Sequence, residues 1–153
     1  MNEPIVIYVP AIPVAQPRVK AGAFGGKARV WTPTTIRKSD GTKKSHPIVE
    51  FKATIRMAAA EIWKLAPLTG PLRIDVCAVF PRTQAQVWKT RPMPRLPHEK
   101  KPDRDNVDKA VLDALKGIVF ADDCQACVGL IEKWVAAGDE QPHVKITVSR
   151  LEC

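Results

Sequence analysis

The sequence has no long apolar run. No stretch approaches the roughly 18 consecutive apolar residues of a membrane-spanning helix, so we expect no membrane segment. The first residues, Met1-Asn2-Glu3-Pro4, lack the basic start of a signal peptide, and we therefore expect a cytoplasmic protein. A hydrophobic share of 45% and a charged share of 26% indicate an ordinary globular protein.

Cysteine and histidine are both scarce. The chain has four cysteines, which we expect to be reduced thiols in a cytoplasmic protein. Cys124 and Cys127 have the spacing of half a zinc site or of a redox motif. No second such pair exists, and the three histidines show no ligand spacing. We therefore interpret the cysteines as small buried hydrophobic residues, with a thiol redox or zinc protein as one alternative function.

Acidic residues are few relative to basic ones. The chain has 16 Asp and Glu against 24 Lys and Arg, which gives a formal net charge of +8. This excess favours a polyanionic partner such as nucleic acid, although charge alone indicates attraction and not fold. Many of the basic residues lie in two turn-rich segments, 18–46 and 81–102. The second segment contains five prolines, and a loop of that length in a compact domain is typically functional or disordered. We expect it to be functional.

The spacing of apolar residues predicts the secondary structure. Apolar residues that recur every three or four positions predict helices over 48–64 and 104–117. Alternating or β-rich runs predict strands over 5–9, 72–80, 128–135 and 144–148, together with a hairpin that has Gly25-Gly26 at its tip and 28–31 as its return strand. This order predicts an α/β fold: a mixed β-sheet with two main helices packed on it, in a single domain that spans residues 1–153.

Aspartates are concentrated in one part of this basic chain. Asp103, Asp105 and Asp108 precede or begin the second predicted helix, and Asp122-Asp123 follows it. One helix cap explains only one aspartate. Crowded like charges repel one another, and a bound divalent cation removes that repulsion. In an extended segment before the helix, Asp103 and Asp105 would point the same way, whereas Asp108 would lie off that side and be solvated.

Adjacent residues of an extended chain point to opposite sides, so we expect only one of Asp122 and Asp123 to face a metal ion. The other would cap a helix, bond the backbone or lie outside the ligand shell. Carboxylate oxygens suit Mg²⁺ or Mn²⁺ and not zinc. A metal ion of this kind activates water for attack on phosphorus and neutralises the developing charge. Lys109, one turn after Asp105, would reach the same pocket and bind phosphate, unless it is a surface lysine paired with Asp105 or Asp113.

These residues resemble the signature of the RusA-type Holliday junction resolvases, in which Asp-x-Asp-Asn is followed by Lys, then Asp, then Asp-Asp. The matching residues here are Asp103-Arg104-Asp105-Asn106, Lys109, Asp113 and Asp122-Asp123. The resemblance implies an endonuclease that depends on Mg²⁺, with Mn²⁺ as a substitute, and that resolves four-way DNA junctions as a homodimer by paired phosphodiester cleavage. It also implies that Asp103, Asp105 and Asp123 bind the metal and that Lys109 is the essential lysine.

Contacts with DNA are predicted from charge alone. The candidates are Arg18, Lys20, Lys100, Lys101 and Arg104. Trp31 or Trp88 would stack on exposed bases at a branch point, although each is more often used for core or loop packing. The alternative to a nuclease is a noncatalytic basic DNA-binding protein whose acidic cluster is a structural divalent-ion site. Metal-dependent cleavage separates the two hypotheses.

Overall fold

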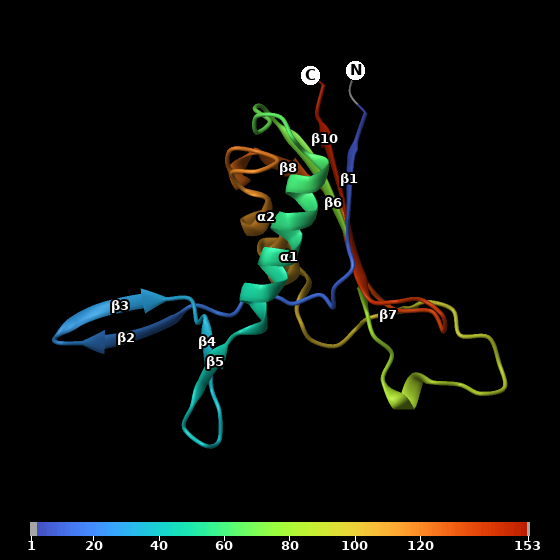
Figure 1. Ribbon diagram of the computed structural model, residues 1–153, viewed down its shortest axis with the longest axis horizontal. Coiled ribbons are helices and arrows are strands. Elements are labelled where there is room, and N and C mark those ends of the chain that lie inside the picture. Colours follow the sequence, from blue (N-terminus) through green and yellow to red (C-terminus); the bar gives the residue numbers. More distant parts are fainter. Residues whose placement is uncertain (1–2, 153) are drawn as a thin grey trace.

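A six-stranded mixed sheet forms the centre of the protein in the computed structural model, which describes residues 3–152 (Figure 1). The spatial order is β1 (Ile5–Val9), β10 (His143–Arg150), β6 (Leu72–Phe80), β9 (Ile131–Val135) and β7 (Leu96–Pro97), and β8 (Ala126–Val128) also pairs with β6. The pairings of β6 with β8 and with β9 are parallel, and the others are antiparallel. The predicted α/β fold class is confirmed.

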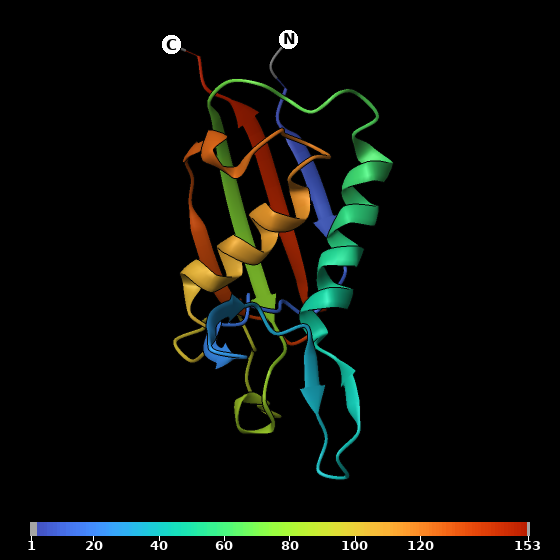
Figure 2. The ribbon, with the colours of Figure 1, turned by 90° about the vertical axis from the view of Figure 1, so that its left-hand side faces the viewer.

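Two helices, α1 (Pro47–Ile62) and α2 (Arg104–Leu115), cover one face of this sheet (Figure 2). The side chain of His46 accepts a hydrogen bond from the Ile48 N–H at 3.1 Å, and Pro47 stands at the first helical position, so both features favour the start of α1. Within the described part of the chain, no helix combines the length and the apolar character needed to cross a bilayer.

The apolar stripe of α2 packs into the core between the sheet and α1. Its buried members are Val107, Ala110, Val111, Ala114 and Leu115. Gly117 takes a φ of 80°, a conformation that suits glycine, and the chain turns there. Both predicted helices are confirmed, and α2 ends two residues earlier than the expected 104–117.

The strand predicted over 128–135 is wrong as a continuous element. Ala126 pairs with Leu72 and Ile131 pairs with Val76, so five steps along one strand match four along the other. The extra residue lies between Ala126 and Val128, which pair with the consecutive residues Leu72 and Arg73. At Gly129, the next residue after Val128, an added Cβ would lie 2.0 Å from the carbonyl oxygen of Ile74. Only glycine fits this close backbone approach, and the chain divides there into β8 and β9. The strands predicted over 5–9, 72–80 and 144–148 are confirmed.

Two hairpins project from the body (Figure 1). The predicted one is formed by β2 (Lys20–Phe24) and β3 (Lys27–Trp31), and Gly25 and Gly26 at its tip have positive φ angles of 59° and 74°. The second, formed by β4 (Thr35–Arg37) and β5 (Lys43–Ser45), was not predicted. All residues of these four strands are exposed, so the hairpins lie outside the core.

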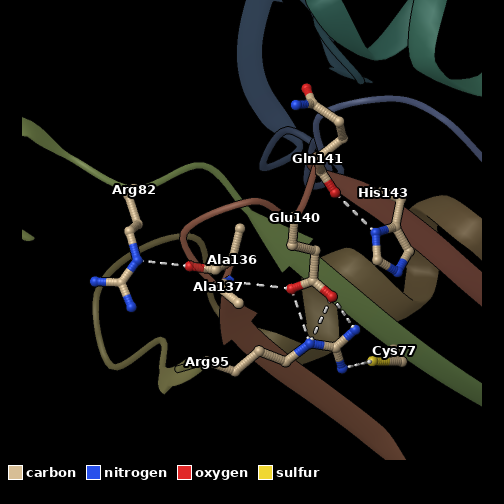
Figure 3. Close-up of polar contacts among 8 residues, drawn as sticks. All are labelled: Cys77, Arg82, Arg95, Ala136, Ala137, Glu140, Gln141 and His143. Carbon is tan, nitrogen blue, oxygen red and sulfur yellow. Dashed lines mark hydrogen bonds and ion pairs between the residues drawn. The ribbon is translucent and has the colours of Figure 1, made fainter. Parts of the chain in front are cut away.

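The long segment 81–102 contains a short helical turn, η1 (Gln84–Gln86), and the edge strand β7. Arg82 Nε donates to the carbonyl oxygen of Ala136 at 2.7 Å, and Arg95 Nε donates to Glu140 at 2.9 Å (Figure 3). The hydrogen bond from Arg95 lowers the pKa of Glu140, so this carboxylate is ionised at neutral pH. These contacts fasten the segment to the chain between β9 and β10.

Candidate functional site

Asp103 and Asp105 lie within the first turn of α2. Asp103 is the N-cap residue, with extended backbone angles and without a side-chain capping hydrogen bond, and Asp105 is already helical. The prediction of an extended segment through Asp105 is therefore wrong, because the helix begins at Arg104. Both carboxylates are exposed at a helix end whose free N–H groups favour negative charge.

The backbone in front of Asp103 is tied to the sheet. Lys133 on β9 donates from Nζ to the carbonyl oxygen of Lys100 at 2.7 Å and to that of Pro102 at 2.5 Å. The backbone N–H of His98 donates to the carbonyl oxygen of Lys133 at 3.1 Å. This arrangement positions the residue that begins the acidic motif. Sequence reasoning missed Lys133, since nothing in its local pattern separates it from other strand lysines.

The segment after β1 also contacts the start of α2. The Gln16 N–H donates to the carbonyl oxygen of Asn106 at 2.8 Å, and the guanidinium of Arg18 lies 3.6 Å from the carboxylate of Asp103. Both members of this ion pair are well exposed, so the pair contributes little to stability and a ligand could displace it. A predicted DNA-contacting residue therefore lies directly beside a predicted metal ligand.

The Asp122-Asp123 pair lies at the other end of α2. Lys116, which follows the last helical residue, places its Nζ 3.1 Å from Asp122 Oδ1 and 3.5 Å from Asp123 Oδ1. The 12 residues of α2 correspond to a rise of about 18 Å. Among residues 3–152, no group of three His, Cys, Asp or Glu side chains could hold an ion. A single chain therefore does not bring Asp123 to Asp103 and Asp105, and their shared role stays a prediction.

Asp122 is the member of the pair that bonds the backbone. Its Oδ1 accepts a hydrogen bond from the Cys124 N–H at 3.4 Å and one from Lys116 at 3.1 Å. Hydrogen bonding with Asp123 and then with Lys116 lowers the pKa of Asp122 to about 2. Asp122 thus helps to form the turn η2 (Asp123–Gln125).

Lys109 is exposed on the helical turn that follows Asp105. Within the described chain, neither the Asp105 nor the Lys109 side chain has a hydrogen bond or an ion pair. The alternative of a surface ion pair for Lys109 is not observed, because Asp113 instead pairs with Lys52 of α1 at 3.2 Å. The charged groups of Asp105 and Lys109 are therefore free to contact a ligand.

Asp108 is not solvated, contrary to expectation. It is half-buried and lines a small hollow with Leu112, Cys127 and Gly129, because its side of α2 faces β8 and β9. Burial in this position raises the pKa of Asp108. Asp108 thus lies outside the exposed group formed by Asp105 and Lys109.

The residues predicted to contact DNA are all exposed. They are Arg18, Lys20, Lys100, Lys101 and Arg104. Three of them flank Asp103 in sequence, and the other two are Arg18, which contacts the Asp103 carboxylate, and Lys20, two residues further on. The expectation for the cysteines is wrong in part: Cys124 and Cys127 are exposed free thiols, and Cys77 is half-buried with a pKa raised by burial. Cys153 lies outside the described residues.

The comparison with protein families gives one match. Residues 10–149, nearly the whole chain, match the family described as Endodeoxyribonuclease RusA. A search of curated proteins found no match. The matched region contains the acidic motif, Lys109, and both segments that contact the start of α2. The chain therefore belongs to the RusA endodeoxyribonuclease family, and it is a Holliday junction resolvase that hydrolyses phosphodiester bonds.

Proposed function

We propose that the chain cuts four-way DNA junctions at the start of α2, with Mg²⁺ as the cofactor and Mn²⁺ as a substitute, and that it acts in the cytoplasm as a homodimer that makes paired cuts. The observation that carries the proposal is the exposed group of Asp103, Asp105 and Lys109 on two successive turns of one helix. RusA nucleases in general depend on a divalent metal ion.

The donor set fits such an ion. Asp103 and Asp105 supply exposed carboxylate oxygens, Asp105 has no competing partner in the described chain, and the partner of Asp103 is an exposed arginine. Mg²⁺ keeps several waters, so two or three carboxylates are enough to hold it. When bound, the ion supplies Lewis-acid stabilisation of the charge that develops on the phosphate.

Asp123 is the proposed third carboxylate, and its position at the far end of α2 suggests how the homodimer contributes. A second copy of the chain would complete each site if its own Asp123 faces the first turn of α2. In a two-fold dimer this contact is reciprocal, so both sites are completed together. The salt bridge from Lys116 would hold this carboxylate in the free chain.

The remaining charges bind the DNA. The ammonium group of Lys109 contacts the scissile phosphate and stabilises its transition-state charge. The exposed basic residues around the site bind neighbouring phosphates, which positions the DNA without reading its sequence. They are Arg18, Lys20, Lys100, Lys101 and Arg104. Shape would then select the branched substrate.

A supercoiled plasmid that extrudes a cruciform tests paired cleavage. The wild-type homodimer should yield mainly linear product, because it cuts two strands of like polarity. Heterodimers of wild type with Asp105→Asn should bind the cruciform and yield mainly nicked circles. Linear product from the heterodimer at the wild-type rate would contradict paired sites. Binding of the wild type without any Mg²⁺-dependent cleavage would instead favour the noncatalytic alternative.

A further inference from the structure

The β2–β3 hairpin has two chemically different faces. Side chains alternate along a strand and directly paired residues share a face, so the pairings of β2 with β3 define both faces. One face, here called the aromatic face, carries Lys20, Gly22, Phe24, Lys27, Arg29 and Trp31. The opposite face carries only small aliphatic side chains: Ala21, Ala23, Ala28 and Val30. The aromatic face therefore alternates cations with two flat rings.

This face is uncovered. Phe24 is 77% exposed and Trp31 is 49% exposed, and the hairpin stands away from the sheet and helices (Figure 1). Both rings line an open hollow of about 560 Å³ on the hairpin. The guanidinium carbon of Arg29 lies 5.8 Å from the centre of the Phe24 ring, a contact within the hairpin itself. Large exposed aromatic residues grouped in this way mark a binding surface.

Gly22 keeps this surface flat. A Cβ added at Gly22 would lie 3.3 Å from Cη2 of Trp31, so the six-membered ring of the indole lies against the glycine. A side chain at position 22 would require the ring to shift by a few tenths of an ångström. The outer side of the indole stays open.

Trp88 offers a useful contrast. The guanidinium carbon of Arg91 lies 3.7 Å from the centre of its ring and that of Arg82 lies 5.1 Å away, so loop cations already occupy the faces of Trp88. Trp88 is therefore a packing residue of the long loop. The sequence left Trp31 and Trp88 as equal candidates for base stacking, and their surroundings favour Trp31.

The charge of the hairpin identifies its partner. No acidic residue lies between Glu3 and Asp40, while the aromatic face alone carries Lys20, Lys27 and Arg29. Cations bind phosphates and open aromatic rings bind the faces of bases that are not stacked in a duplex. The base of the hairpin also lies near the candidate site, since Arg18 contacts Asp103 two residues before β2 begins.

We propose that the aromatic face of β2–β3 binds unstacked base faces and the neighbouring phosphates at the branch point, with Trp31 as the stacking platform. This inference rests on the proposed function for its substrate, because the open centre of a four-way junction leaves the faces of its central base pairs unstacked. Each strand of five residues spans about 17 Å. The aromatic face therefore reaches bases next to the scissile phosphate, which the proposed function places at the start of α2 beside Asp103.

Equilibrium binding without divalent metal tests the proposal. The probes are a single-stranded oligonucleotide, a synthetic four-way junction and a linear duplex, each titrated with wild type and with Trp31→Ala. Stacking on an aromatic ring contributes roughly 1–3 kcal/mol per base, so Trp31→Ala should weaken binding to the single strand and the junction by about 5- to 150-fold. Binding to the duplex should change by less than about twofold, because its bases are already stacked.

Two matched variants control for folding and for lost surface area. Val30→Ala removes an aliphatic side chain from the opposite face and should bind all three probes as wild type does. Trp31→Phe keeps an aromatic ring and should restore most of the affinity. Melting temperature and sedimentation velocity of each variant show whether the fold and the oligomeric state are retained.

Three outcomes would overturn the inference. Unchanged binding by Trp31→Ala would remove the platform, and an equal loss on all three probes would place the hairpin in a duplex groove. Dissociation of a wild-type dimer by Trp31→Ala would make a second copy of the chain the partner. Failure of the proposed function looks different: a wild type that does not cut the junction in Mg²⁺, yet loses single-strand affinity with Trp31→Ala, supports the platform and refutes only the cleavage.

Discussion

Lys133 donates a 2.5 Å hydrogen bond to the carbonyl oxygen of Pro102, the residue directly before Asp103. A second bond to the carbonyl oxygen of Lys100 makes this lysine a clamp between the sheet and the acidic motif. Among the described residues, its ammonium group pairs with no carboxylate. Lys133 is therefore a positioning residue for the candidate site.

Lys133→Met keeps the length of the side chain but removes both hydrogen bonds. A misplacement of about 1 Å at a reacting group reduces catalysis by roughly 100-fold, so kcat on a four-way junction should fall by up to that factor. KM and junction binding should change little, and Lys133→Arg should recover part of kcat. Equal losses in kcat, DNA binding and melting temperature would instead make Lys133 a general structural residue.

Subunit mixing tests whether the metal site is shared between two copies of the chain. Asp105→Asn and Asp123→Asn homodimers should both be inactive. If each site combines Asp105 of one copy with Asp123 of the other, a heterodimer of the two variants contains one intact site. The mixture should then nick a cruciform plasmid, and activity should follow the heterodimer fraction. A mixture as inactive as its parents would place all three carboxylates in one subunit or remove Asp123 from the site.

Lys109→Ala should abolish most cleavage without a change in fold. The side chain is exposed and has no partner in the described chain, so its removal leaves no buried group unsatisfied. Lys109→Arg should restore little, because a planar guanidinium places its charge differently from an ammonium group. Circular dichroism and single-turnover cleavage provide the two measurements. Unfolding of either variant would show that Lys109 supports the structure.

Asp108 gives a pH-dependent prediction for stability. Burial raises its pKa in the folded state, so the folded protein holds this proton more tightly than the unfolded chain does. The buried charge therefore lowers the free energy of unfolding at neutral pH, and the penalty disappears as the pH falls below about 4. Asp108→Asn should raise the melting temperature at pH 7 and leave it near that of wild type at about pH 3.

Asp139→Asn is the control for this comparison, since Asp139 is exposed in the turn between β9 and β10. It should change the melting temperature little at either pH. A lower melting temperature for Asp108→Asn at pH 7 would mean that the carboxylate makes a favourable interaction that outweighs its burial.

The parts of the fold that the sequence predicts are those with a buried periodic stripe, such as α2 and β6. Apolar spacing reports directly on burial, so these elements follow from it. The β4–β5 hairpin was missed because its strands are short and fully exposed, and such strands show no alternation between buried and exposed positions. The break at Gly129 depends on the carbonyl of Ile74, which is remote in sequence.

The candidate site likewise has a part that the sequence predicts and a part that it does not. The proximity of Asp105 and Lys109 follows from helical spacing alone. The position of Asp123 depends on how the chain returns after Gly117, where Phe120 bridges to both Lys116 and Leu68. That return keeps the Asp122-Asp123 pair at the end of α2, and no local pattern indicates it. Lys133 likewise becomes a clamp only when β9 pairs beside β6.

The most direct test of the metal-dependent site is cleavage of a synthetic four-way junction by wild type and by Asp105→Asn, with a matched linear duplex as the control substrate. Wild type should cut the junction in Mg²⁺, spare the duplex, and cut neither without metal. Loss of a residue that hydrogen-bonds to a metal ligand reduces activity by about 10- to 100-fold, so the loss of a ligand itself should exceed that range while junction binding persists. Cleavage by Asp105→Asn near the wild-type rate, or cleavage by wild type without divalent metal, would contradict the account.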